Sequence, residues 1–578
     1  MQKPRLLAVA FAAALVFSAC QAQATPTPTA QPTPTPPPGE TAGPTPTAAP
    51  TPTPSGGPVS GGTLIFGASS DPATLDVVQI QDGESFRIAQ QIYDTLLRLK
   101  PGSASELESG LAKTWDVTDG GTTIVFHLEE GVKFHDGTPA DAEAIAFNVN
   151  RWKNMPEELQ GLQYYPGAVF GGFGDDSNII SAEATGDLDV TMKLKNPRSD
   201  ILLAMTLIPF GIQSPKALTD HEADKADSDY WQTAPTGTGP FKFEGDFVAG
   251  DHYTIVRNDD YWDEMHPAYL DEVVFKPIAD GTQRVAALQA GTVDIIDQVD
   301  PNLIPQIDGD ANLQRLNRTP MNSGWIGFNQ RQEPFDDLDV RMAVAYAIDK
   351  QAIVDAFFPG VGQPADSDMF PSFAAYEPGA FPGEYNTAKA KELLEGSSCP
   401  PPCAIDFWYP DEVSRPYMVD PKGEFEAMRP MLEAAGFAVT PQHKPWRQGY
   451  LTDEANGAYG LFLIGWIYDY GDPANGPGIF YSKSTAECGG VVPTGPINCE
   501  YGQENQAAYD LMQQAIAEAD PAKATDLWKQ TMKMIGADLP KVPLVWTFGV
   551  LAATTQVNGY VPSPTQSEYF NLVWKSAD

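Results

Sequence analysis

An acidic residue set among aromatic side chains is the first feature of this sequence that could do chemistry. The segment GWIYDYGDP, residues 465–473, places Asp469 three residues after Trp466 and at the end of an apolar run. A buried carboxylate costs free energy unless a cation or hydrogen-bond donors compensate it. The segment therefore leaves three partners open for Asp469: a cation of the protein, the backbone amides of a turn, or a ligand. Residue type alone favours the turn.

Local catalytic motifs are absent from the sequence. HExxH, GxSxG and CxxC do not occur, and no glycine-rich segment matches GxxxxGK[ST] or GxGxxG. The six histidines are dispersed and lack the spacing of metal ligands. A hydrolase whose nucleophile is assembled only in space stays open as an alternative. The sequence favours a binding protein that uses no cofactor and no metal.

The charge balance is strongly acidic, with 76 Asp and Glu against 36 Lys and Arg and a net charge of −40. Nucleic-acid binding requires clustered cations, so this balance argues against a nucleic-acid partner. We interpret the acidic surface as one that keeps an exported protein soluble, although a cationic ligand is also compatible with it.

The N-terminal residues predict export and lipidation. A basic start, Met1–Arg5, precedes the apolar run Leu6–Phe17 and small residues before Cys20, which is the pattern of a secretory signal. The apolar run is shorter than the about 20 residues that span a bilayer. Because Ser-Ala-Cys resembles a lipobox, we expect residues 1–19 to be removed and Cys20 to be lipidated, with ordinary secretion as the alternative. The Thr- and Pro-rich residues 20–61 predict a disordered tether.

The other four cysteines form two local pairs, Cys399 with Cys403 and Cys488 with Cys499. In an exported protein such pairs predict disulfides. A zinc site is the alternative, but CxxC spacing and neighbouring histidines are both missing.

Helical and strand patterns alternate along the rest of the chain, which predicts an α/β fold. The roughly 515 residues after the tether are too many for one core and predict two or three domains. Apolar periodicity predicts helices over residues 86–97, 140–152 and 340–357 and strands over residues 61–66, 124–128, 190–194 and 543–546.

Several blocks of this sequence resemble the bacterial solute-binding proteins of peptide and nickel ABC importers, often called family 5. In the order of that family, the blocks are residues 112–139, 237–243, 257–262, 287–295, 328–350 and 465–473. The resemblance implies a two-lobed periplasmic-binding-protein-like clamp of type II, of the large peptide-binding class, with an inserted extra domain in lobe one. It also implies a monomer outside the cytoplasm, either periplasmic or anchored to the outer face of the cytoplasmic membrane, with an ABC permease and ATPase as partners.

The same resemblance implies the domain boundaries. A discontinuous first domain would comprise residues 62–94, 234–320 and 540–578, with residues 95–233 as the inserted domain and 321–539 as the second lobe. The crossovers near 321 and 540 would form a hinge. A ligand that touches both lobes would then favour the closed state.

By resemblance, Asp469 would bind the α-ammonium group of a peptide, and Trp446 would cover the ligand. The loop that begins at Gln81 would pair with the ligand through its backbone, like an added strand. The full set of candidate ligand contacts is Gln81, Asp82, Gly83, Trp325, Trp446, Trp466, Asp469 and Trp546.

One departure from the family concerns the other end of a peptide. Some oligopeptide-binding members carry an arginine six residues before the acidic residue, and this chain has Leu463 there. Arg447 or Lys444 are candidates to replace it, although each fits equally well as a surface charge. An oligosaccharide or a nickel chelate therefore stays an alternative ligand, and a sensor or chaperone stays an alternative role.

Overall fold

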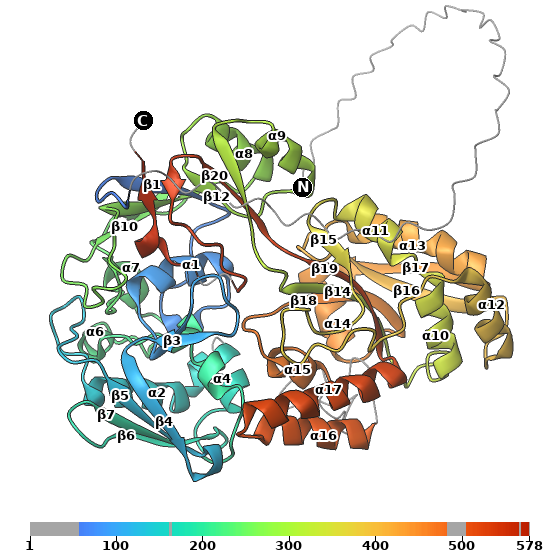
Figure 1. Cartoon of the computed structure of the whole chain (residues 1–578), viewed down its shortest axis with the longest axis horizontal. Coiled ribbons are helices and arrows are strands. Elements are labelled where there is room, and N and C mark those ends of the chain that lie inside the picture. The colour runs from blue at the N-terminus through green and yellow to red at the C-terminus, as the bar shows by residue number, and fades with distance from the viewer. Residues whose placement is uncertain (1–56, 161–163, 482–504, 566–567, 577–578) are drawn as a thin grey trace, which may run out of the picture. The chain divides into compact units, whose positions relative to one another are not determined.

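The structure, a computed structural model, describes residues 57–160, 164–481, 505–565 and 568–576 (Figure 1). The predicted signal peptide, Cys20, most of the tether and the pair Cys488 and Cys499 lie outside the described residues. Cys399 and Cys403 are joined by a disulfide, with their Cα atoms 5.2 Å apart.

The first large sheet has eight strands drawn from distant parts of the chain. Its order is β13-β20-β12-β1-β11-β10-β8, with β9 paired to β10. β1 runs parallel to β11 and β12, and the remaining pairs are antiparallel. The strands are β1 (Thr63–Ala68), β8 (Phe241–Lys242), β9 (Phe247–Val248), β10 (His252–Arg257), β11 (Glu272–Pro277), β12 (Ile295–Ile296), β13 (Leu313–Asn317) and β20 (Val550–Thr554).

The segment between β1 and β8 forms its own four-stranded antiparallel sheet, in the order β4-β5-β7-β6. This sheet and the first large sheet, with their helices, are called lobe one below. The strands of the four-stranded sheet are β4 (Ala112–Thr118), β5 (Thr123–Leu128), β6 (Ile179–Ala184) and β7 (Asp189–Leu194). They are preceded by the pair β2 (Leu97–Leu99) and β3 (Leu107–Ser109). The helices of lobe one are α1 (Gly83–Ile92), α2 (Ala142–Lys153), α3 (Glu157–Gln160), α4 (Tyr164–Phe170), α5 (Ile201–Ala204), α6 (Pro215–Asp220), α7 (Tyr230–Thr233), α8 (Gly281–Gln289) and α9 (Ile304–Asp308).

Lobe two is built on a six-stranded sheet in the order β15-β19-β14-β18-β16-β17. Its strands are β14 (Asn322–Phe328), β15 (Gly362–Pro364), β16 (Cys403–Asp411), β17 (Phe437–Pro445), β18 (Leu461–Ile467) and β19 (Lys541–Thr547). Its helices are α10 (Leu338–Ala347), α11 (Lys350–Phe357), α12 (Thr387–Gly396), α13 (Pro421–Ala435), α14 (Leu451–Ala455), α15 (Pro477–Phe480), α16 (Gln506–Ala517) and α17 (Pro521–Asp538). The C-terminal pair β21 (Val557–Asn558) and β22 (Trp574–Lys575) follows the return to lobe one.

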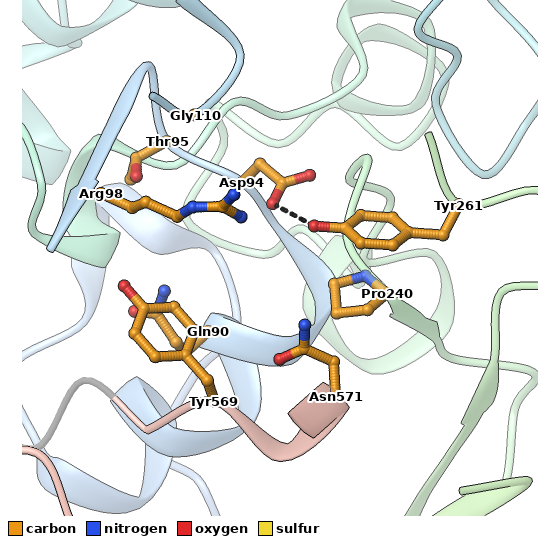
Figure 2. A pocket seen from close by; sticks show the side chains of 9 residues that line it. All are labelled: Gln90, Asp94, Thr95, Arg98, Gly110, Pro240, Tyr261, Tyr569 and Asn571. Carbon is orange, nitrogen blue, oxygen red and sulfur yellow. Dashed lines mark hydrogen bonds between the residues drawn. The ribbon is translucent and has the colours of Figure 1, made fainter. Parts of the chain in front are cut away.

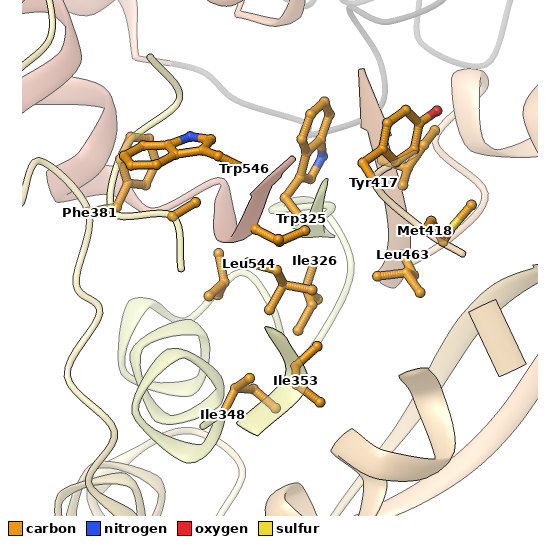
Figure 3. Close-up of a cluster of buried hydrophobic side chains, with 14 of the residues drawn as sticks. Trp325, Ile326, Ile348, Ile353, Phe381, Tyr417, Met418, Leu463, Leu544 and Trp546 are labelled. Carbon is orange, nitrogen blue, oxygen red and sulfur yellow. The ribbon is translucent and has the colours of Figure 1, made fainter. Parts of the chain in front are cut away.

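An apolar core surrounds the central strands of lobe two. Figure 3 shows Ile326 of β14, Leu463 of β18 and Leu544 of β19 on the side of the strands toward Ile353 of α11, with the Trp325 ring of β14 pointing away from Ile353, and all of them are buried. β14 is a central strand of the sheet and is buried along its whole length. Leu463, the residue that stands in place of the family's arginine, is therefore a core residue.

The chain passes between the two large sheets twice, at residues 318–321 and 548–549, and the backbone N–H of Arg318 donates to the carbonyl of Gly549 (3.1 Å). The return was predicted at residue 540, but β19 still pairs with β14 in lobe two. The apolar run 543–546 indicated a strand, and periodicity alone cannot assign a strand to one sheet or another. The other domain boundaries stay predictions.

Two helices end earlier than the sequence pattern predicted. α1 ends at Ile92, where the N–H of Gly239 donates to the Ile92 carbonyl (2.9 Å) and the chain turns into an extended segment. The long helix expected over residues 340–357 is two helices. Ile348 is extended, and the Asp349 side chain accepts the N–H of Ala352 (3.0 Å) and so caps α11.

Candidate functional site

The carboxyl ends of three parallel strands meet at one edge of the lobe-two sheet. β16 runs parallel to both β17 and β18. Arg415 follows β16, Trp446 follows β17 and Asp469 follows β18. In α/β folds, ligands bind at such an edge, outside the carboxyl ends of the strands. The topology therefore brings two of the predicted ligand contacts to the place where a site is expected.

Asp469 lies where the two lobes touch. Its Oδ1 accepts a hydrogen bond from the hydroxyl of Tyr165 in α4 of lobe one (3.0 Å). Its Oδ2 accepts from Nδ2 of Asn475 (3.1 Å), whose Oδ1 in turn accepts the N–H of Asp469 (2.7 Å). Among the described residues, no cation lies within ion-pair distance of this carboxylate. Burial raises the pKa of Asp469 to about 6, although the hydrogen bonds from Asn475 and Tyr165 lower it.

The turn after β18 is capped by a different acidic residue. The Asp472 carboxylate accepts the N–H of Ala474 (2.8 Å) at the start of the 3-10 turn Pro473–Asn475. Within the described chain, no backbone amide donates to the carboxylate of Asp469. The turn-cap explanation of Asp469 was therefore wrong. Burial and the negative charge of Asp200 raise the pKa of Asp472 to about 7.

Two predicted tryptophans form a row with Ser323. Ser323 of β14 pairs with Trp466 of β18 and with Trp546 of β19. Directly paired residues of antiparallel strands point to the same face of a sheet. The Ser323 hydroxyl and both indole N–H groups are buried and have no hydrogen-bond partner within the described part of the chain. The row therefore offers buried polar groups that a ligand or a water molecule can satisfy.

Trp325 lies deeper than this row. Its ring is 1% exposed and packs against Phe480, with the ring centroids 5.1 Å apart. The ammonium group of Lys541 lies 3.7 Å from the centre of the Trp325 ring and 2.9 Å from Oδ1 of Asp368. These contacts make Trp325 part of the core beneath the site.

Trp446 is 7% exposed and stacks with Tyr450. The guanidinium carbon of Arg415 lies 5.3 Å from the centre of the Trp446 ring. No hydrogen bond or ion pair engages this guanidinium among the described residues, and its Nε is buried. Tyr417, which follows in the same turn, packs on β18, because a Cβ at Gly465 would lie 2.3 Å from its ring. The turn that carries Arg415 is thus held against the strand that leads to Asp469.

Arg415 is the residue that sequence reasoning missed. It lies in an irregular turn and belongs to no periodic pattern. The only local feature that could have drawn attention to Arg415 is its place directly before Pro416, in a turn that follows a strand. Of the two cations considered instead, Lys444 is half exposed and forms an ion pair with Asp453. The side chain of Arg447 lies outside the described side chains.

The loop predicted to pair with a ligand leads into the first turn of α1. The Asp82 carboxylate accepts the N–H of Ser85 (2.9 Å) and so caps this helix, which begins at Gly83. Phe86 of the same turn packs edge-to-face on Tyr165, with ring centroids 5.5 Å apart. Through Tyr165, the start of α1 is linked to Asp469. Gln81 itself is exposed.

Two cavities lie away from these residues. One in lobe one, of about 10 Å³, is lined by polar groups that include Asp94, Arg98 and Asn571 (Figure 2), and it has room for about one water molecule. The other, of about 410 Å³, lies beside Lys350 and Tyr385 in lobe two. Neither is lined by a predicted ligand contact.

Two absences hold for the described residues. No group of three or more His, Cys, Asp or Glu side chains there could hold a metal ion. The helices in this part of the chain are also too short or too polar to cross a bilayer.

Comparison with known proteins finds relatives along most of the chain. The family model "Bacterial extracellular solute-binding proteins, family 5 Middle" matches residues 106–487. The dipeptide-binding protein of Escherichia coli K12 is 26% identical over 523 residues, which cover 88% of this chain and 94% of that protein. Heme-binding protein A of Haemophilus influenzae is 28% identical over 514 residues, which cover 87% of this chain and 90% of that protein.

Two solved structures are similar to this one over nearly their whole length. HbpA2 from Haemophilus parasuis has a TM-score of 0.79 at 25% identity, with 89% of this chain and 100% of that chain covered. DppA from Helicobacter pylori in complex with the peptide STSA has a TM-score of 0.71 at 25% identity, with 89% and 98% covered. The predicted two-lobed clamp is confirmed. These relatives are substrate-binding proteins and not enzymes.

Proposed function

Because this chain belongs to the bacterial extracellular solute-binding proteins of family 5, we propose that it is the receptor of an ABC importer. It captures a short peptide between its two lobes, outside the cytoplasm, and delivers it to the permease and ATPase. A ligand that contacts both lobes favours their closure, and the transporter then distinguishes the closed receptor from the open one. This role needs no catalytic group.

One observation carries the choice of a peptide. The Asp469 carboxylate is buried where the lobes touch, and it has hydrogen-bond donors from both lobes but no cation among the described residues. A ligand ammonium group supplies the missing charge through a charge-assisted hydrogen bond. A ligand without a cation leaves the buried carboxylate uncompensated, which gives selectivity for a free amino terminus.

Arg415 is the proposed partner for the carboxylate of the same peptide. Its guanidinium group lies over Trp446 and lacks a carboxylate partner within the described chain. The planar guanidinium fork matches a carboxylate with two parallel hydrogen bonds. Asp469 and Arg415 would thus hold the two charged ends of a short peptide. Peptide names among the relatives, such as the di/tripeptide-binding protein 1 of Pseudomonas aeruginosa, support this assignment.

The alternative ligands find less support. An oligosaccharide stacks on open aromatic faces, but Trp325, Trp466 and Trp546 each already pack against another protein ring. A nickel chelate would be held by placed Arg or His groups. Among the described side chains at this edge, Arg415 is without an ion-pair partner, whereas the His443 ring is hydrogen-bonded to Asp411. Experiment can distinguish a sensor, chaperone or hydrolase from the proposed transport receptor.

Calorimetry with one dipeptide in three forms tests the proposal: the free form, the N-acetylated form and the C-amidated form. The free dipeptide is expected to bind most tightly. Arg415→Met should lower its affinity about tenfold or more, because a charged hydrogen bond is lost, and should leave the affinity of the amidated form unchanged. Lys444→Met serves as the control and should bind all forms like the wild type.

Two results would count against this assignment. An equal loss for the free and amidated forms in Arg415→Met contradicts the carboxylate contact. Absence of binding for every peptide, with a hexose series or heme retained in native mass spectrometry of the purified protein, contradicts the peptide itself. Turnover of the retained ligand would favour a hydrolase.

The membrane anchor is a separate proposal that rests on residues 1–61 of the sequence. The small residues before Cys20 fit signal cleavage and lipidation, and the Thr- and Pro-rich segment after it fits a tether. Cys20→Ser in the full-length protein is expected to move the receptor from the membrane fraction to the soluble fraction. Fractionation with antibody detection measures this, and continued membrane association of the variant would refute the lipid anchor.

A further inference from the structure

The segment around Asp469 sends its two tyrosines into different lobes. Tyr468 is buried in the core of lobe two, and its hydroxyl donates to the carbonyl of Asp368 (2.7 Å). Tyr470 comes from the same turn but is buried among the apolar side chains of lobe one and is 2% exposed. Its hydroxyl donates to Oδ2 of Asp200 (2.7 Å). The proposed ligand-binding carboxylate thus lies between one residue anchored in its own lobe and one inserted into the other.

Asp200 is held in place to receive this hydroxyl. Its carboxylate is fully buried and accepts two hydrogen bonds from Arg198, from Nε (2.9 Å) and Nη2 (2.6 Å). Arg198 is fixed in turn by the carbonyl of Val169 (2.8 Å). Although Asp200 stands directly before α5, its side chain does not cap that helix. The carboxylate is therefore oriented by lobe one and completed by Tyr470 of lobe two.

Two backbone hydrogen bonds reinforce this contact. The N–H of Gly471 donates to the carbonyl of Ala104 in lobe one (2.8 Å), and the N–H of Ser199 donates to the carbonyl of Ile516 in α16 (2.7 Å). A Cβ at Gly471 would lie 3.0 Å from both Cβ and O of Ala104, so only glycine allows this approach without displacement. The contact is formed entirely by groups of the protein.

We propose that Tyr470 and Asp200 form a latch that stabilises the closed arrangement of the two lobes. Opening the lobes withdraws a buried aromatic ring from lobe one and breaks a hydrogen bond to a charged group, and both changes cost free energy. Because Tyr470 directly follows Asp469 in the chain, the latch also positions the Asp469 carboxylate opposite Tyr165. Tyr470 and Asp200 are positioning residues, and they set the open–closed equilibrium on which a ligand acts.

The latch is formed by groups of the protein alone, so its test requires no ligand and can fail independently of the peptide assignment. Hydrogen–deuterium exchange of the full chain reports on it through the amides of Ser199 and Gly471, which bond across the lobes. Tyr470→Phe should speed exchange at Ser199 on the order of tenfold, because exchange of a protected amide follows the population of the open state. The amides of β14, deep in lobe two, should keep the exchange rates of the wild type.

Tyr468→Phe is the matched control. It removes a buried tyrosine hydroxyl bond two residues away, but one that lies within lobe two, and it should leave Ser199 protected. Gly471→Ala is a second variant that crowds only the Ala104 contact and should also speed exchange at Ser199. The latch is refuted if Ser199 exchange is unchanged in Tyr470→Phe and Gly471→Ala. It is equally refuted if Tyr468→Phe has the same effect, or if exchange at β14 rises in parallel.

Discussion

Replacing Asp469 with asparagine is expected to lower the affinity for a peptide with a free amino terminus by about 10- to 100-fold. The amide keeps the size of the side chain and an oxygen for Tyr165, but it removes the negative charge that the ligand ammonium needs. A hydrogen bond to a charged group contributes about 1.5–3 kcal/mol, which corresponds to this range. Calorimetry of the wild type and the variant with the same dipeptide measures the loss.

Asp472→Asn is the matched control for this change. Asp472 lies in the same turn but caps the 3-10 turn through the N–H of Ala474, a role that asparagine fulfils equally well. The affinity of Asp472→Asn for the free dipeptide is expected to stay close to that of the wild type, because the cap is preserved. An equal loss in both variants would mean that the negative charge of the turn matters in general and that Asp469 does not contact the ammonium group.

The raised pKa of Asp469 predicts a specific pH profile. Burial raises it from 3.8 to about 6, so the carboxyl group of the empty protein becomes protonated as the pH falls below about 6. A peptide amine titrates near pH 8 and stays charged throughout this range. Affinity is therefore expected to be level between about pH 6.5 and 7.5 and to fall toward about tenfold per pH unit well below 6. Asp469→Asn should show no such fall, and an identical fall in that variant would assign the titration to another group.

The sequence allowed the strand end and its acidic residue to be found, because both are local. The carboxylate of Asp469 follows an apolar run that is strand β18, as the pattern predicted. Its partner Tyr165 is 304 residues away, and the partner of Tyr470 is 270 residues away. No periodicity encodes such pairs, because each joins two segments that are distant in the sequence and lie in different lobes.

The remaining differences have equally physical causes. Asp469 and Asp472 are both aspartates next to a turn, and the sequence does not show which of them accepts a backbone N–H of the 3-10 turn. The path of the backbone decides this, and it selects Asp472. Arg415 belongs to an irregular turn, and its proposed role rests on its contact with the ring of Trp446, which follows a different strand, β17. The return to lobe one was predicted before β19 because an apolar strand fits either of two buried sheets, and the sequence pattern does not show which sheet it joins.

Removing the carboxylate of Asp368 is expected to lower the free energy of unfolding of lobe two by about 3–5 kcal/mol, the usual cost of breaking a buried ion pair. The side chains of Lys541 and Asp368 are each 1% exposed, with Nζ and Oδ1 2.9 Å apart. Asp368→Ala leaves the Lys541 ammonium buried beside the Trp325 ring without its carboxylate. Urea unfolding monitored by tryptophan fluorescence measures the change, and a loss below about 1 kcal/mol would put this pair in the range of an exposed one.

A double variant separates the charge from the other contacts of Asp368. Asp368→Ala with Lys541→Met removes both charges, so it is expected to be more stable than Asp368→Ala alone. Glu392→Ala, which breaks the exposed pair with Lys389, is the surface control and should cost less than about 1 kcal/mol. Asp368 also accepts a hydrogen bond from the Tyr481 hydroxyl. If the double variant is no more stable than the single one, the cost arises from that lost acceptor and not from the broken ion pair with Lys541.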